Sequence, residues 1–390
     1  MVDIGFRRRA SAQDLCDSHV VRLRRSKLGG PGLHRVRRGK GWSYRDDDGR
    51  PVDKETKERI DSLVIPPAWK DVWICPHPNG HIQAVGTDDA GRRQYLYHPV
   101  WREIRDRAKH ERVQELVPHL PELRRRVRRD LREEGLPRER VIAVALRMLD
   151  LGLFRTGGEE YEQEHGTHGV TTLYRKHVTV DGERVYFRFP AKSGVQREAT
   201  VKDPALALAI SALKQSQAPG KRLLQYRDGQ QWREVTGTDV NTEFKALTGS
   251  DFTVKDLRTW AATVTAATAL AALSVENGQN PKAVAEARKR SAEKKRRPPT
   301  PSRTAAARTE RQVVKLVSEQ LGNTPAVARR SYVDPVVFEK HSSGTTLATT
   351  GRLFKRLSKA DHKRALAGQP LSPKGRVVVE KAVLKLLRSD

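Results

Sequence analysis

Cysteine is scarce in this chain, with only Cys16 and Cys75 among 390 residues. Two cysteines are too few for a disulfide framework or for a cysteine-rich zinc site. Long apolar segments are also missing, because no run approaches the roughly 20 residues that cross a bilayer. The basic start of the chain is not followed by the apolar stretch of a secretory signal. These absences predict a cytoplasmic protein without a membrane-spanning segment.

The motifs of nucleotide and metal chemistry are missing as well. The sequence contains no GxxxxGK[ST] loop, no HExxH pair and no acidic cluster with metal-ligand spacing. The first of these motifs holds phosphates and the second holds zinc. We therefore expect no cofactor, neither a metal nor a nucleotide.

Positive charge, in contrast, is abundant. The chain has 75 Lys and Arg residues against 47 Asp and Glu, which gives a formal net charge of +28. A body this basic repels itself and is stabilised by a polyanionic partner. The composition therefore predicts a cytosolic, nucleoid-associated protein. Composition alone does not separate an enzyme from a basic DNA-packaging protein, so the motifs must decide.

The pattern along the chain predicts an α+β protein. Residues 1–40 are rich in Arg and Gly and are typical of a basic arm, and residues 41–103 show short alternating runs typical of a small β-rich domain. Helical periodicity prevails over residues 104–345. Residues 288–311 lack an apolar stripe and contain adjacent prolines, which predicts a flexible basic linker. Residues 346–390 form a basic, helix-prone tail.

Two segments of the β-rich region carry recognisable strand signals. The run KDVWICPHPNGHIQAVG has apolar positions on both sides of a PNG turn and predicts a β-hairpin. In GRRQYLYH, alternation places Arg93, Tyr95 and Tyr97 on one face of a strand and Gln94 and Leu96 on the other. The first of these faces is basic and aromatic.

The helical region contains a second hairpin and several marked helix ends. A helix opened by Pro137 is expected to end in residues 154–158, at the glycine pair of FRTGG. Asp181-Gly182 predicts a tight turn between two strands, and a third strand over residues 195–201 follows a turn that holds Lys192. A partial capping box, Thr253-x-x-Asp256, precedes an apolar helix.

Five polar or aromatic positions in this region have an ordinary structural explanation as well as a chemical one. Arg155 could complement a helix dipole, Lys192 could be a solvated turn residue, and Asn323 could begin the helix that starts at Pro325. Tyr332, at the end of that helix, could serve packing. Arg258 is harder to explain structurally, because a lone guanidinium in an apolar helix needs a partner.

Taken in order, the strings GRRQYLYH, LFRTGGEEY, FPAKSG, VKDLRTW and LGNTPAVARRSY resemble the type IB DNA topoisomerases, in particular their compact poxviral and bacterial branch. The resemblance spans roughly residues 60–340. It implies a β-rich N-terminal domain and a larger, mainly α-helical catalytic domain of the type IB topoisomerase/tyrosine recombinase kind. It also implies that the protein clamps duplex DNA as a monomer.

The resemblance assigns a role to each of the five positions. It implies that Arg155 and Arg258 are the catalytic arginines, Lys192 the catalytic lysine and Tyr332 the nucleophile. Asn323 stands where many members have a histidine, and an amide there can hydrogen-bond a phosphate but cannot titrate.

The resemblance also implies a DNA-contacting set. Gln94, Tyr95 and Tyr97 resemble residues with which the family's N-terminal domain contacts DNA, Arg93 belongs to the same basic strand, and Tyr161 resembles a further contact.

The implied activity is relaxation of supercoiled DNA by transient cleavage and religation of one strand through a 3′-phosphotyrosyl intermediate, independent of ATP and metal. Two alternatives stay open. A tyrosine recombinase uses a similar residue set, but its second arginine usually follows a histidine in H-x-x-R, whereas here Lys255 precedes Asp256-Leu257-Arg258. In the second alternative, a non-catalytic DNA-packaging protein, function would not depend on Tyr332.

Overall fold

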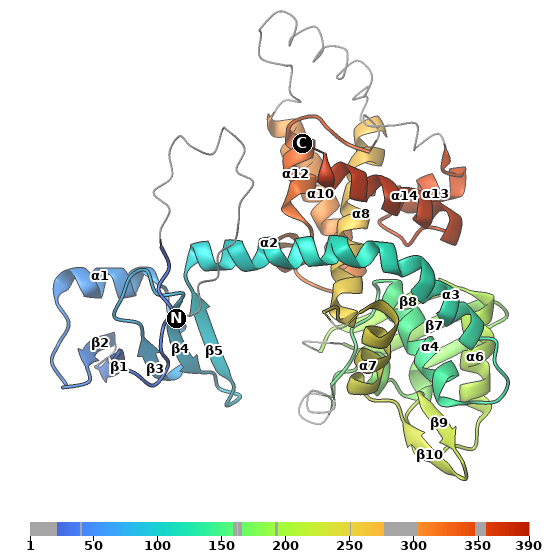
Figure 1. Cartoon of the computed structure of the whole chain (residues 1–390), viewed down its shortest axis with the longest axis horizontal. Helices are drawn as coiled ribbons and strands as arrows, with labels where there is room; N and C mark the ends of the chain where they lie inside the picture. Colours follow the sequence, from blue (N-terminus) through green and yellow to red (C-terminus); the bar gives the residue numbers. More distant parts are fainter. Residues whose placement is uncertain are drawn as a thin grey trace, which may run out of the picture. The chain divides into compact units, whose positions relative to one another are not determined.

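The computed structural model describes residues 22–39, 41–158, 162, 166–191, 194–249, 251–276, 303–347 and 356–389. The chain forms two compact units, Met1–Ala108 and Lys109–Asp390. The first is built on a β-sheet and the second is mainly helical, so the α+β class is as predicted (Figure 1). The division falls five residues after the predicted one, inside helix α2 (Pro99–Leu116).

The first unit is an antiparallel sheet of five strands in the order β2-β1-β3-β4-β5. One helix, α1 (Lys54–Ser62), begins at Asp53, whose side chain accepts from the backbone N–H of Thr56. A small core forms from Ile60 of this helix and apolar residues of the strands, such as Ile74. The strands are β1 (Leu33–Arg38), β2 (Gly41–Asp46), β3 (Lys70–Ile74), β4 (Ile82–Thr87) and β5 (Arg93–Tyr97).

The prediction that residues 1–40 form an arm is wrong for residues 33–38. These residues are β1, which pairs along its whole length with β2 and also with β3. Leu33 enters the core, and the Arg35 guanidinium donates to the carbonyl of Pro66 at 3.0 Å. The arginines of this strand mask its alternating pattern in the sequence, and residues 1–21 lie outside the described residues.

The second unit combines two antiparallel sheets with a helical body. The DG hairpin is confirmed, because β6 and β7 pair through Asp181 and Arg184 and β8 adds to β7. The sheets are formed by β6 (Val178–Asp181), β7 (Arg184–Pro190) and β8 (Gln196–Lys202), and by β9 (Gln225–Asp228) and β10 (Gln231–Glu234).

Helix α8 lies at the centre of the helical body. Most of its residues are buried, and it packs against α4, α10, α13 and α14. The helices and 3-10 turns of this unit, after α2, are η1 (Val117–His119), α3 (Leu120–Asp130), α4 (Arg138–Asp150), η2 (Val170–Thr172), η3 (Arg175–His177), α6 (Pro204–Gln215), α7 (Gly237–Thr248), α8 (Val254–Glu276), α10 (Arg303–Leu321), α11 (Pro325–Ser331), α12 (Pro335–Ser342), α13 (Lys359–Leu366) and α14 (Pro373–Arg388).

Two predicted boundaries are corrected by these helices. The expected linker over residues 288–311 is helical from Arg303 onward, since α10 buries small side chains, Ala306 and Thr309, rather than a large apolar stripe. Residues 288–302 lie outside the described residues. Helix α4 ends at Asp150, ahead of the glycine pair, because Gly152 adopts a left-handed φ of +73°.

The separate basic tail predicted over residues 346–390 is also wrong. Val379 and Val383 of α14 belong to the main core of the second unit. Arg376 of the same helix donates to the buried Asp150 at 2.9 Å, and Glu380 accepts from the indole N–H of Trp260 on α8 at 3.2 Å. The C-terminal helices are therefore part of the body that holds α4 and α8.

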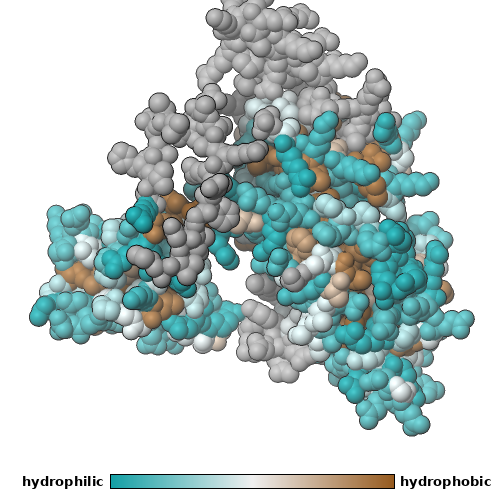
Figure 2. Space-filling model, in the orientation of Figure 1, coloured by the Kyte–Doolittle hydropathy of each residue, from teal (hydrophilic) through white to brown (hydrophobic). Residues whose placement is uncertain are grey.

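The surface is predominantly hydrophilic on the face shown in Figure 2, where apolar residues appear as separate patches. Within the described part of the chain, no helix combines the length and the apolar character that a membrane crossing requires.

Candidate active site

Arg258 is buried in α8, one turn from its start. Helix α8 follows Thr253, whose backbone N–H and hydroxyl both donate to Asp256, at 2.9 and 3.1 Å. The Arg258 side chain is only 5% exposed, and its guanidinium donates to the carbonyls of Gly152 and Phe154 at 3.3 and 3.2 Å. The buried cation, for which the sequence requires a partner, thus has its donors hydrogen-bonded by main-chain oxygens.

Arg155 lies in the loop that follows α4, close to Arg258. Gly152 lies so close to α8 that a Cβ atom built on it would stand 2.5 Å from the Cβ of Ala261, so a larger residue is excluded there. Arg155 lies in an irregular segment after the helix, not in its last turn as predicted. Its Nη2 donates to the carbonyl of Gly322 at 3.1 Å and to the amide oxygen of Asn323.

Asn323 occupies the turn between α10 and α11. It is not the residue that caps α11, because Thr324 takes that role and accepts from the N–H of Val327. The Asn323 side chain instead accepts from Arg155 through Oδ1. Its buried Nδ2 has no hydrogen-bond partner among the described residues. The amide is thereby oriented, and it keeps a donor for another acceptor.

Tyr332 follows directly at the carboxyl end of α11. The Cζ atom of Arg258 lies 5.4 Å from the centre of the Tyr332 ring. The chain is fixed on the far side of this residue by Thr263 of α8, whose hydroxyl donates to the Tyr332 carbonyl at 3.4 Å and accepts from the N–H of Asp334 at 3.1 Å. The side chain of Tyr332 is partly buried against the main core.

The charges of this cluster act on the tyrosine hydroxyl. Burial alone would raise the pKa of Tyr332, but the positive charges of Arg258 and Arg155 outweigh it and lower that pKa. Burial and the neighbouring Arg155 charge also lower the pKa of Arg258, which is still a cation at neutral pH. The arrangement can therefore stabilise a phenolate, or an anion bound next to it.

The structure thus brings four of the five predicted positions together: Arg155, Arg258, Asn323 and Tyr332. Lys192 lies outside the described residues, and the hairpin that contains it is described up to Ala191 and again from Gly194. Tyr161 also lies outside the described residues.

Arg197 on β8 joins the cluster and was missed by the sequence analysis. Its Nη1 donates to the carbonyl of Glu319 at 2.5 Å. A signal was available, because Arg197 shares the inward face of β8 with Ala199 and Val201. A charged residue on the apolar face of a strand requires a specific partner.

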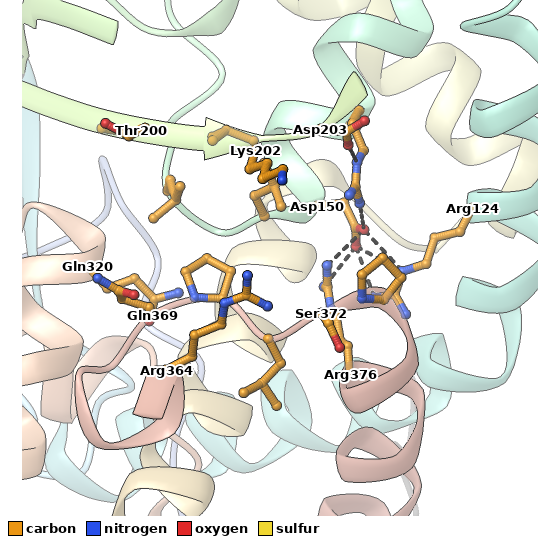
Figure 3. Close-up of a pocket in the computed structure, with 18 of the residues that line it drawn as sticks. Arg124, Asp150, Thr200, Lys202, Asp203, Gln320, Arg364, Gln369, Ser372 and Arg376 are labelled. Atoms are coloured by element: carbon orange, nitrogen blue, oxygen red, sulfur yellow. Dashed lines mark hydrogen bonds and ion pairs between the residues drawn. The ribbon is translucent and has the colours of Figure 1, made fainter. Parts of the chain in front are cut away.

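A cavity of about 1060 Å³ adjoins this cluster and shares Arg197 with it. Figure 3 shows its ion pairs, in which Asp150 is surrounded by arginines. None of Arg155, Arg258, Asn323 and Tyr332 lines the cavity. Asp150 and Asp203, which line the cavity, are paired with arginines, and these buried ion pairs hold the end of α4 in place.

The basic and aromatic face predicted in the first unit is confirmed as an exposed face. On β5, Tyr95 and Tyr97 are 37% and 38% exposed, and their rings stack with centres 6.0 Å apart and an interplanar angle of 16°. Arg93 on the same face is exposed as well. Gln94 is partly buried and donates to Asp88 at 2.9 Å.

Two family models match the chain. The model described as eukaryotic DNA topoisomerase I, catalytic core, matches residues 99–332, a range that includes Arg155, Arg258, Asn323 and Tyr332. The model described as bacterial DNA topoisomerase IB, N-terminal domain, matches residues 41–88. Helices α13 and α14 lie beyond both matches.

Curated proteins of two viral groups are similar to the chain. A DNA topoisomerase 1B of Acanthamoeba polyphaga mimivirus is 30% identical over 308 residues, which cover 77% of this chain and 85% of that protein. A DNA topoisomerase 1B of Vaccinia virus (strain Copenhagen) is 22% identical over 257 residues, covering 65% of this chain and 71% of that protein. A DNA topoisomerase I of Monkeypox virus is 23% identical over 257 residues, with the same two shares.

Proposed function

The chain belongs to the type IB DNA topoisomerases and relaxes supercoiled DNA, and we propose that it does so by cutting and resealing one strand of a duplex through Tyr332. The observation that carries this proposal is the position of the Tyr332 ring, 5.4 Å from the Cζ atom of the buried Arg258. A cation fixed beside a tyrosine favours the phenolate, which is the stronger nucleophile.

In the proposed reaction, the Tyr332 oxygen attacks the phosphorus of a phosphodiester. The new bond joins the phenolic oxygen to phosphorus, and the bond from phosphorus to the 5′-oxygen breaks. The phenol loses its proton to solvent, and the departing 5′-oxygen gains one. The phosphotyrosyl ester conserves the energy of the broken bond, so the reverse attack by the 5′-hydroxyl reseals the strand without ATP.

Arg155, Arg258 and Asn323 are proposed to stabilise the negative charge that grows on the phosphate oxygens. Donors fixed in advance stabilise such charge without reorganising during the reaction. The carbonyl contacts of Arg258 fix its guanidinium, and the free Nδ2 of Asn323 is a suitable donor to an oxygen. An amide at this position supports charge stabilisation rather than proton transfer.

Lys192 is proposed as the acid that protonates the 5′-oxygen. An ammonium group near arginines has a lowered pKa and releases its proton more readily. This role is carried over from the family motif FPAKSG, to which residues 189–194 correspond.

Arg93, Gln94, Tyr95 and Tyr97 of β5, together with Tyr161, are proposed to contact duplex DNA. The exposure of the two stacked tyrosines and of Arg93 supports this for the β5 face. We further propose that the protein clamps DNA as a monomer and works in the cytoplasm in association with the nucleoid, as its net charge of +28 suggests.

Relaxation of a supercoiled plasmid in EDTA, without ATP and without a partner DNA, tests the proposal. The expected result is a ladder of topoisomers that ends at the relaxed form. A strict requirement for magnesium or for specific paired sites would contradict it and favour another class of topoisomerase or a recombinase. An unchanged linking number would favour a packaging protein.

A further inference from the structure

We infer that Arg197 is a positioning residue for the proposed active site. It links the segment that carries Arg155 to the turn that carries Asn323, and so it sets the phosphate-binding donors before DNA arrives. The inference rests on the proposed function, because it assigns a role within that site.

Arg197 lies on β8, next to the connection that carries Lys192, and it contacts the segments that carry Arg155 and Asn323. Its own strand, β8, forms a hairpin with β7, and Lys192 belongs to the connection between them. Its Nη2 donates to the carbonyl of Leu153 at 3.4 Å, two residues before Arg155. The same atom donates to the carbonyl of Gln320, three residues before Asn323.

The carboxyl end of α10 is the common acceptor of the cluster. The last carbonyls of a helix have no partner within it and form the negative end of its dipole. Here Glu319 and Gln320 accept from Arg197, and Leu321 accepts from Arg258. The next carbonyl, that of Gly322, accepts from Arg155.

Three guanidinium groups are thus gathered at one helix end, where repulsion among them is opposed by their attraction to the carbonyl oxygens. The arginines repel one another, and burial together with the Arg155 charge lowers the pKa of Arg197. The carbonyls at this helix end offset that repulsion by accepting hydrogen bonds. Loss of Arg197 leaves two carbonyls of α10 without this donor, and it releases the turn that orients Asn323.

The geometry of the contacts requires an arginine rather than a lysine. A guanidinium presents several donors in a fixed plane and can hold three carbonyls at once, whereas an ammonium is a compact point charge. The Gly322 backbone lies against this side chain, with a built Cβ atom 3.6 Å from Nη1 of Arg197. Its three hydrogen-bond acceptors are main-chain carbonyls, as expected of a group that positions other groups.

Arg197→Ala and Arg197→Lys test the inference, with Arg233→Ala as the matched control. Arg233 lies on β10 in an exposed pair with Asp228 at 2.8 Å, so both alanine variants lose one positive charge. Single-turnover formation of the covalent adduct is measured on a labelled suicide duplex at saturating enzyme. We expect Arg197→Ala to slow this step by roughly tenfold or more, Arg197→Lys to recover part of the rate, and Arg233→Ala to match the parent protein.

A second readout separates positioning from mere structural support. In the double variant, the fold-loss in rate should be smaller than the product of the fold-losses of Arg197→Ala and Asn323→Ala, because both changes disturb the same donor. Noncovalent DNA affinity, and its dependence on salt, should change no more in Arg197→Ala than in Arg233→Ala. If Arg197→Ala does not fold, Arg197→Lys carries the same comparisons.

Four outcomes decide the matter. Unchanged adduct formation in both Arg197 variants would overturn the inference and leave the proposed function intact, and so would fully independent rate losses. A salt slope reduced by about one beyond that of the control would show a direct phosphate contact instead. Failure of the parent protein to form any adduct would refute the proposed function itself.

Discussion

Arginines serve the two units of this protein in different ways. In the second unit, Arg258 is buried and its guanidinium is held by main-chain carbonyls of the loop after α4. In the first, Arg93 lies exposed beside the stacked Tyr95 and Tyr97 on β5. The buried arginine has a fixed direction, whereas an exposed one keeps its side-chain freedom and its water.

This difference indicates which unit should control the reaction rate and which should control DNA affinity. A buried, oriented charge acts strongly on charge that develops nearby, and so it governs a reaction rate. An exposed charge is screened by salt and contributes mainly to encounter and affinity. The two units should therefore separate in experiment, one affecting the rate of cleavage and the other the binding of DNA.

The largest expected effect comes from Tyr332→Phe. This change removes one hydroxyl and leaves the ring packed against Arg258, so folding and DNA affinity should barely change. The covalent adduct should disappear, because phenylalanine offers no oxygen for the ester. Denaturing gel analysis of a labelled duplex measures the yield of the adduct. An undiminished yield would show that Tyr332 is not the nucleophile.

Arg258→Ala should come next, with a cleavage rate lower by roughly 10²-fold or more. The nucleophile is still present, so trace adduct should accumulate over long times. Arg93→Ala is the matched change in the first unit and should leave the rate at saturating enzyme unaltered. The contrast between the two units would fail if Arg93→Ala slowed the bound complex as much as Arg258→Ala.

Asp150→Asn tests how the buried network supports the second unit. Arg124 and Arg376 surround this carboxylate and, against the cost of burial, hold its pKa well below the ordinary range. A carboxyl with a pKa lower in the folded than in the unfolded state stabilises the fold above its unfolded pKa, and this stability is lost as the pH falls toward the folded pKa.

We therefore expect Asp150→Asn to lower the free energy of unfolding at neutral pH by about 3–5 kcal/mol. Asp228→Asn in the exposed pair with Arg233 should cost about 0–1 kcal/mol. Chemical denaturation, followed by circular dichroism, measures both. Equal costs would mean that the buried pairs do not support α4 and α14 as described.

Tyr95→Ala and Tyr97→Ala should have smaller effects, and on binding alone. Each change removes one ring of the exposed stack, and we expect about 1 kcal/mol, or roughly a fivefold weaker affinity for duplex DNA. Fluorescence anisotropy at several salt concentrations checks this. A loss of cleavage rate at saturating enzyme, with affinity unchanged, would place these residues in the chemistry instead.

The smallest predicted effect is a displaced pH profile in Arg155→Ala, separate from the loss of rate that this variant also causes by removing a proposed phosphate-binding arginine. Because the pKa of Tyr332 is lowered by Arg258 and Arg155, its phenolate is available at a lower pH than that of an ordinary tyrosine. Arg155→Ala removes one of these charges and should move the rise of the cleavage rate to higher pH. Single-turnover rates across the alkaline range measure the shift, and a rise moved to lower pH would contradict the electrostatic explanation.

Local patterns in the sequence sufficed for much of the fold. The alternation of GRRQYLYH correctly predicts which side chains of β5 are exposed, and Asp181-Gly182 correctly predicts the hairpin of β6 and β7. The sequence does not distinguish Gly152 from the later glycine pair as the end of α4, whereas in the structure Gly152 adopts a φ of +73° and lies against Ala261 of α8. That contact is not visible in a local pattern.

The same limit applies to the site. Ordered motifs predicted the residues that meet, Arg155, Arg258, Asn323 and Tyr332, but not what orients them. The arginines donate to main-chain carbonyls at the end of α10. Every residue has such a carbonyl, so the residue types in the sequence do not indicate which ones accept. The sequence predicts a linker for the first turns of α10, because the buried Ala306 and Thr309 are too small to form an apolar stripe.

The central claim is tested most directly by locating the covalent bond in the parent protein. The protein is trapped on a labelled suicide duplex with denaturant and digested, and the peptide that carries the nucleotide is sequenced by mass spectrometry. We predict that the modification lies on Tyr332, within the segment from Thr324 to Asp334, and that it is attached to the 3′-phosphate. A nucleotide on any other residue, or attached through a 5′-phosphate, would contradict the account.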